Sequence, residues 1–226
     1  MQLYMFQIDN SFINLIFLGM IALFPVINPI GSAFMVSPYL AHLCPADKRV
    51  AVQKITIYAF FICIISLFAG QYILRLFGIS MPIVQLGGGI MICKMGWEFL
   101  STDDKKDTAE GVEKPVVVPF KSIANRLFYP ITFPITTGAG TISVLFTLGA
   151  HVTVFGSREY YMNMLSIILA ITAMCVLVYI FYLNTEKLIH YLGENGEMVV
   201  NRISAFLIFC VGLKIGFSGL TAILHL

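Results

Sequence analysis

Residues 24–31 read FPVINPIG and interrupt a long stretch that carries no formal charge. A single helix over residues 12–43 would be about 48 Å long at about 1.5 Å per residue, whereas the hydrocarbon core of a bilayer is only about 30 Å thick. The residue before a proline is pushed out of the helical region, and asparagine is among the best helix N-caps. We therefore predict that one helix ends near Ile27 and that a half-helix, capped by Asn28, begins at Pro29.

The overall composition is that of an all-α, polytopic membrane protein. Of the 226 residues, 58% are hydrophobic and only 12% are charged, and the mean hydropathy is +0.88. A soluble domain carries about 25% charged residues, and the apolar residues here form continuous runs. Because a bilayer accommodates such a surface, we expect lipid as the main partner. The net charge of +2, from scattered basic residues, gives no reason to expect nucleic acid.

A second uncharged stretch, residues 127–157, is also too long for one simple span. It is interrupted within PITFPITTGAGTIS, residues 130–143. Thr137 and Gly138 are candidates for the cap of another half-helix, and the glycines would let a ligand approach the backbone. The sequence thus predicts a second broken helix, comparable to the first.

The two breaks fall at matching positions of an internal repeat. Two further apolar runs follow each break, at 55–74 and 79–100 and at 160–183 and 203–224. We predict six transmembrane helices in two three-helix repeats, residues 1–100 and 122–226, joined by a charged linker at 101–121. Since three is an odd number of spans, the repeats would be inverted, as in many transporters. The matched positions are Phe24-Pro25-Val26 with Phe133-Pro134-Ile135, Gly31 with Gly140, and Ser32 with Thr141; a small insertion also matches Lys94-Met95-Gly96 with Lys214-Ile215-Gly216.

The distribution of lysine and arginine predicts the orientation, because cytoplasmic loops carry an excess of both. Ten of these residues follow the first, third and fifth spans, whereas only Arg75 and Arg158 fall on the other side. We therefore expect both termini on the non-cytoplasmic side and the linker 101–121 in the cytoplasm. The ten are Lys48, Arg49, Lys54, Lys105, Lys106, Lys114, Lys121, Arg126, Lys187 and Arg202.

The candidate substrate-binding site consists of small and polar residues around the two breaks. Helix N-termini inside a protein suit a carboxylate or another anionic group, with a dipole contribution of about 0.3–2 kcal/mol. Because the side chains are neutral, we expect a small neutral or zwitterionic solute. Two alternatives stay open. The prolines and glycines would only kink helices or let them pack closely, and Gly212-x-x-x-Gly216 is such a packing motif. The serine and threonine hydroxyls would only bond to the backbone of their own helix. The candidates are Asn28, Pro29, Gly31, Ser32, Thr136, Thr137, Gly138, Gly140 and Thr141.

Charged and catalytic residues are scarce in the predicted spans. Lys214 lies well inside the last span, where a charge costs about 2.5–3.5 kcal/mol, so it is a candidate for an intramembrane charge role. Lys94 and Glu98 lie four residues apart, and a surface ion pair explains both. The sequence holds no hydrolase, metalloprotease or P-loop motif, and its five cysteines lack the spacing of a metal site. We expect neither an enzyme nor a bound metal or cofactor.

The stretches at 24–31 and 130–143, with the chain length and the charged middle loop, resemble the MarC family of bacterial inner-membrane proteins. This family is also grouped as neutral amino acid transporters and is similar to the LysE-type exporters. The sequence departs from the family pattern at Phe34 and Ala139, which stand in place of prolines. The resemblance implies a secondary transporter or facilitator of a small solute, with an amino acid as first candidate, in the inner membrane. A non-transporting scaffold or envelope-maintenance component is the alternative, and homo-oligomerisation stays open.

Overall fold

The structure, a computed structural model, describes residues 12–101, 123–150 and 158–224. These residues are helical apart from short turns and include no strand, so the predicted all-α class is confirmed. The predicted linker 101–121 lies outside the described residues except for Ser101. The elements are α1 (Phe12–Ile27), α2 (Pro29–Leu40), α3 (Pro45–Leu76), α4 (Met81–Ser101), η1 (Leu127–Thr136), α6 (Ala139–Ala150), α7 (Arg158–Leu183) and α8 (Thr185–Leu224).

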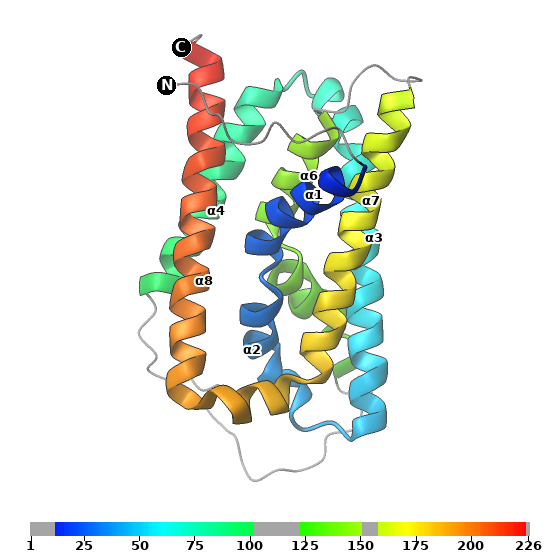
Figure 1. Ribbon diagram of the computed structural model, residues 1–226, viewed down its shortest axis with the longest axis vertical. Helices are drawn as coiled ribbons and strands as arrows, with labels where there is room; N and C mark the ends of the chain where they lie inside the picture. The colour runs from blue at the N-terminus through cyan, green and yellow to red at the C-terminus, as the bar shows by residue number, and fades with distance from the viewer. Residues whose placement is uncertain (1–11, 102–122, 151–157, 225–226) are drawn as a thin grey trace.

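Two pairs of long helices frame the bundle (Figure 1). α3 packs beside α7, and α4 packs beside α8. The short elements α1, α2, η1 and α6 lie between the two pairs. The beginning of α1 and the end of α8 lie at one end of the bundle, whereas the turns from α2 to α3 and from α7 to α8 lie at the other. The broken segments are therefore held in the interior.

Four stretches of the described chain are long and apolar enough to cross a membrane: Phe12–Leu40, Pro45–Gly70, Arg158–Leu183 and Ala205–Leu224. The pair η1 and α6, which is bent by 62°, makes a fifth if it is taken as one span. α4 has 21 residues but is not among these spans, and it carries Lys94 and Glu98. The described residues thus support four to five spans, and the sixth span stays a prediction.

Both predicted breaks are present. α1 ends at Ile27 and α2 begins at Pro29, with Asn28 between them in the left-handed backbone region at φ 43°. In the second half η1 ends at Thr136 and α6 begins at Ala139. The first break falls at the predicted residues because the sterics of the position before a proline leave the backbone little choice.

Glycines bring the backbones of α4 and α8 into direct contact. A Cβ on Gly89 would lie 2.5 Å from Gly216 Cα and 2.7 Å from the Gly212 carbonyl oxygen. Small residues allow this approach in membrane helices, where van der Waals packing drives association. The two helices run antiparallel, as the contacts Gly96 with Phe209, Cys93 with Gly212, Gly89 with Gly216 and Leu86 with Gly219 establish.

An ion pair fastens the end of the bundle that holds the turn from α7 to α8 (Figure 1). Lys48 Nζ donates to Glu186 Oε1 at 2.8 Å, which joins the first turn of α3 to the first turn of α8. The Lys48 side chain is only 10% exposed, whereas that of Glu186 is 70% exposed. The pair therefore ties α3 to α8 at the end of the bundle where both helices begin.

The glycine contact predicts different outcomes for two neighbouring substitutions in α4. Gly89→Ala should lower the free energy of unfolding by about 1–3 kcal/mol, because the added methyl group overlaps the α8 backbone. Gly87→Ala is the matched control: a Cβ there has no heavy atom within 4 Å among the described residues, and alanine improves helix propensity by about 0.5–1 kcal/mol. Thermal unfolding of purified protein in detergent measures both. Equal stability of the two variants would contradict the packing described here.

Candidate functional site

Asn28 builds the first break and caps α2 itself. Its backbone adopts φ 43° and ψ 68°, a left-handed conformation that asparagine tolerates better than most residues. Its Oδ1 accepts a hydrogen bond from the Gly31 N–H at 3.1 Å. Its carbonyl accepts from the Ser32 N–H at 2.9 Å and from the Ser32 hydroxyl at 2.8 Å. Asn28 is confirmed as the cap, and its polar atoms are largely used within the break.

The second break begins with an irregular backbone. Tyr129 and Phe133, which precede the prolines of η1, have extended dihedral angles of φ −124°, ψ 127° and φ −114°, ψ 122°. This is the conformation to which a following proline drives a residue. The carbonyl of Gly138 accepts the first bond of α6, from Ile142 N–H at 3.2 Å. The cap of α6 is therefore Gly138 rather than Thr137, the other candidate.

Three threonine hydroxyls hold the wide turns of η1. Thr132, Thr136 and Thr137 are buried, and each donates to the carbonyl five residues earlier, at 2.6, 2.9 and 3.1 Å respectively. Hydroxyls that bond to nearby backbone replace part of the missing helical ladder. For these three residues, as for Ser32, the structure bears out the alternative that the hydroxyl serves its own backbone.

Tyr182 of α7 joins the two breaks. Its side chain is fully buried, and its hydroxyl lies 2.8 Å from Thr136 Oγ1. The single proton of Thr136 is already donated to the Ile131 carbonyl, so Tyr182 donates to Thr136. The Ser32 hydroxyl is a further polar neighbour of the tyrosine. Sequence reasoning missed Tyr182, because nothing in its apolar run distinguishes it from Tyr179, one turn earlier.

Two further hydroxyls in the interior have no hydrogen-bond partner among the described residues. Thr141 Oγ1 and Ser143 Oγ are inaccessible to solvent and make no hydrogen bond to any described residue, and the residues are 1% and 6% exposed. Ser143 points at Gly88 of α4, which offers no side chain to bond with. Both residues lie on α6, within its first two turns. Among the described hydroxyls of the two breaks, these two are left without a hydrogen-bond partner.

Lys214 lies away from this cluster. Its side chain is on the exposed surface of α8, beside the exposed Leu213 and Phe217. The intramembrane charge role of Lys214 stays a prediction, and the interior polar cluster does not include it. Lys94 and Glu98 form an exposed pair at 3.6 Å, as expected from their spacing.

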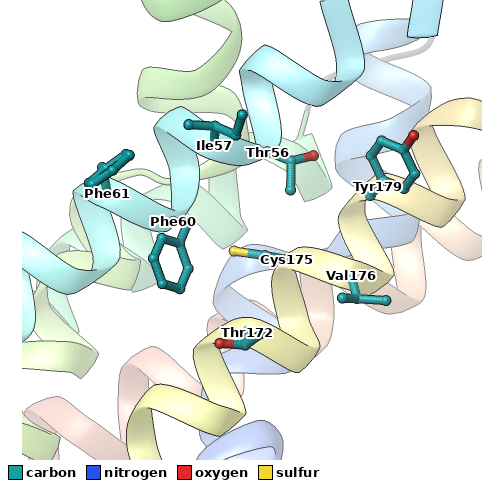
Figure 2. A pocket seen from close by; sticks show the side chains of 8 residues that line it. All are labelled: Thr56, Ile57, Phe60, Phe61, Thr172, Cys175, Val176 and Tyr179. Atoms are coloured by element: carbon teal, nitrogen blue, oxygen red, sulfur yellow. The ribbon is translucent and has the colours of Figure 1, made fainter. Parts of the chain in front are cut away.

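Two grooves lie outside the cluster of breaks. The first, of about 330 Å³, opens where α3 crosses α7, and its side chains are apolar apart from two threonines and a tyrosine (Figure 2). The hydroxyls of Thr56 and Thr172 donate to carbonyls of their own helices. The second, of about 430 Å³, lies between the beginnings of α1 and α7 and includes Arg158, Glu159 and Asn163. Neither groove contains a residue of the predicted binding site.

The fold and the site define an integral membrane protein of helices, with a neutral polar cluster where two interior helices break. A model of the MarC family of integral membrane proteins matches residues 13–224, and the chain belongs to this family.

Curated relatives extend over nearly the whole chain. The inner membrane protein MarC of Salmonella paratyphi A is 24% identical over 208 residues, which cover 92% of this chain and 94% of that protein. The proteins of the same name from Salmonella typhi and from Escherichia coli O6:H1 are similar at the same identity and coverage. No solved structure matches the chain. The predicted resemblance to the MarC family is thereby confirmed.

The buried tyrosine predicts a stability difference between two positions of α7. Tyr182→Phe should lower the free energy of unfolding by about 1–2 kcal/mol, because the buried Thr136 oxygen loses its donor. Tyr179→Phe is the control, since that side chain lines the outer groove, and a change within about 0.5 kcal/mol is expected. Thermal unfolding in detergent compares them. A Tyr182 variant as stable as the Tyr179 variant would rule out the hydroxyl as a link between the breaks.

Proposed function

We propose that this protein is a secondary transporter or facilitator of a small neutral or zwitterionic solute, with an amino acid as the leading candidate. The observation that carries the proposal is the pair of buried, unpartnered hydroxyls of Thr141 and Ser143 at the second break. Leaving a buried polar group unpaired costs about 1–3 kcal/mol. A solute that hydrogen-bonds to these groups would remove that cost, which gives the interior cluster a ligand-binding role.

The solute bound there should carry no net charge. The hydroxyls, the Asn28 amide and the backbone groups of the two breaks are all neutral, and the described residues place no acidic or basic side chain among them. An isolated ion in this surrounding would lack a counter-charge, whereas a zwitterion brings its own.

An inverted repeat with six spans is the architecture we propose for transport. α1 packs against α7 as η1 packs against α3, and α2 contacts α7 and α8 as α6 contacts α3 and α4. These contacts interchange when the two halves are exchanged, and the antiparallel pair α4 and α8 maps onto itself. Counting α4 as a span gives six. Movement of one repeat against the other would expose the closed site to each side in turn.

The orientation we propose has both termini outside the cytoplasm. The ten cytoplasmic lysines and arginines expected from the sequence support it. Lys48 and Glu186 would then close the cytoplasmic end, and the groove with Arg158 and Glu159 would open on the opposite side. The relatives are named as inner membrane proteins, which supports placement of this chain in the inner membrane.

A ligand screen tests the function directly. Purified protein in detergent should be stabilised by one or more neutral L-amino acids, by about 2.7 kcal/mol at a concentration about 100 times Kd. A thermal-shift panel of the neutral amino acids, with lysine and glutamate as charged comparisons, measures this. No stabilisation by any compound of the panel would favour the non-transporting scaffold.

The role of α6 is tested by flux into proteoliposomes. Thr141→Val should lower the uptake of the stabilising amino acid at least about tenfold, because a hydrogen bond to a charged group is worth about 1.5–3 kcal/mol. Thr147→Val makes the same chemical change on the same helix, where the hydroxyl donates to the Ser143 carbonyl instead. Uptake by this control should stay near wild type. Equal uptake by both variants would remove Thr141 from the site.

A further inference from the structure

We propose that the two breaks bind opposite ends of one α-amino acid. The N-terminus of α6 binds the carboxylate, and the C-terminus of α1 binds the ammonium group. This assignment rests on the transport function proposed above and adds the orientation of the solute. What supports this orientation is the set of backbone groups that the two breaks leave without a hydrogen-bond partner among the described residues.

The first turn of α6 presents unpaired N–H groups in the interior. The first bond of the helix runs from Ile142 to the Gly138 carbonyl, so the N–H groups of residues 138–141 precede it. No carbonyl or side chain among the described residues accepts a hydrogen bond from them. Gly138, Gly140 and Thr141 are buried, so these residues are shielded from bulk solvent. A helix end with free N–H groups is a site for an anionic oxygen.

The hydroxyl of Thr141 is a second, independent feature of the same end. It is buried and without a hydrogen-bond partner among the described residues. Because the Cα–Cβ bonds of a helix tilt toward its N-terminus, this side chain in the first turn extends toward the unpaired N–H groups. A threonine hydroxyl that donates to a carboxylate makes a strong, charge-assisted hydrogen bond.

The N-terminus of α2 does not offer the same site. Pro29 has no N–H, the Gly31 N–H is bonded to the Asn28 side chain, and the Ser32 N–H is bonded to the Asn28 carbonyl. Ile30 is therefore the one residue of this first turn whose N–H bonds to no described residue. The carboxylate therefore belongs at α6, although the sequence repeat alone makes the two half-helices look equivalent.

The C-terminus of α1 supplies the opposite charge. Pro29 cannot donate to the Pro25 carbonyl, and no hydrogen bond among the described residues ends on the carbonyls of Val26 or Ile27. The C-terminal end of a helix carries partial negative charge. α1 contacts α6, and a Cβ on Gly140 would lie 3.8 Å from Val26 Cγ1. The negative end of α1 thus lies beside the positive end of α6, an arrangement complementary to a zwitterion.

Analogues that lack one charged group test the orientation. Binding to detergent-purified protein would be measured by thermal shift for L-alanine, L-alaninamide and propionate, and for L-leucine, L-leucinamide and 4-methylpentanoate, in sodium chloride and in choline chloride. The amino acids should bind at least about tenfold more tightly than the amide or the deaminated acid of the same side chain.

Variants separate the two helix ends. Thr141→Val should reduce the preference for the acid over the amide, and Thr141→Ser, which keeps the hydroxyl, should retain it. Asn28→Gly permits the same positive φ without the capping side chain, and it should change the affinities for acid and amide by the same factor. Thr141→Ala replaces Thr141→Val if the latter does not insert.

Each contrary result overturns a different statement. Equal binding of amide and acid by the wild type, or an unchanged preference in the Thr141 variants, would overturn the carboxylate site at α6. Binding of propionate as tight as that of L-alanine in sodium chloride but not in choline chloride would assign the carbonyls of α1 to a sodium ion instead. Binding of the amino acids with neither preference would leave the transport proposal standing and remove the orientation. Silence toward every neutral amino acid would remove both.

Discussion

Backbone hydrogen bonding inside a bilayer is the constraint on which this structure depends. In the hydrocarbon region each N–H and C=O group must find a partner within the protein or face a site buried in it. The regular backbone hydrogen bonds of the helices are interrupted at the two breaks, and nearby side chains replace many of them. Asn28 bonds to the first turn of α2, and three threonines bond to the carbonyls of η1. Among the described residues of the breaks, most of the groups that stay unpaired lie at the end of α1 and the beginning of α6. These groups give the interior its capacity to bind a polar solute.

Irregular backbone at this depth is tolerated because a rigid frame encloses it. The glycine contacts let α4 and α8 approach until their backbones touch, and α3 and α7 close the other side. One segment of α4 contacts both the neighbouring long helix and the interior, since Gly89 faces Gly216 of α8 whereas Gly88 faces Ser143 of α6. A glycine beside Ser143 packs closely but offers no polar group, so the frame itself leaves that hydroxyl without a partner.

The sequence predicts local features of this fold much better than contacts between distant segments. The break at Ile27, Asn28 and Pro29 follows from sterics and capping within a few residues, and the structure places it there. The sequence does not distinguish Thr137 from Gly138 as the cap of α6, because wide turns that contain two prolines can end in several conformations. Tyr182 could not be found at all: its meeting with Thr136 depends on how α7 packs on η1, which no spacing within the sequence encodes. Likewise, the hydroxyls of Thr136 and Thr141 are alike in sequence, and only the structure separates the bonded one from the free one.

The difference between the two breaks is what makes a neutral solute physically reasonable. Two equivalent half-helices would direct two positive ends into one interior, a field that favours an anion and disfavours an amino acid with its ammonium group. Proline at the start of α2 and its asparagine cap remove most donors at one end, whereas glycine and alanine keep them at the other. Within the proposed repeats, Thr136 and Tyr182 belong to the same half, and Ser32 belongs to the other. Rocking of the halves would therefore preserve the bond from Tyr182 to Thr136 and separate Tyr182 from Ser32, so the second break can move as a unit with the carboxylate it is proposed to hold.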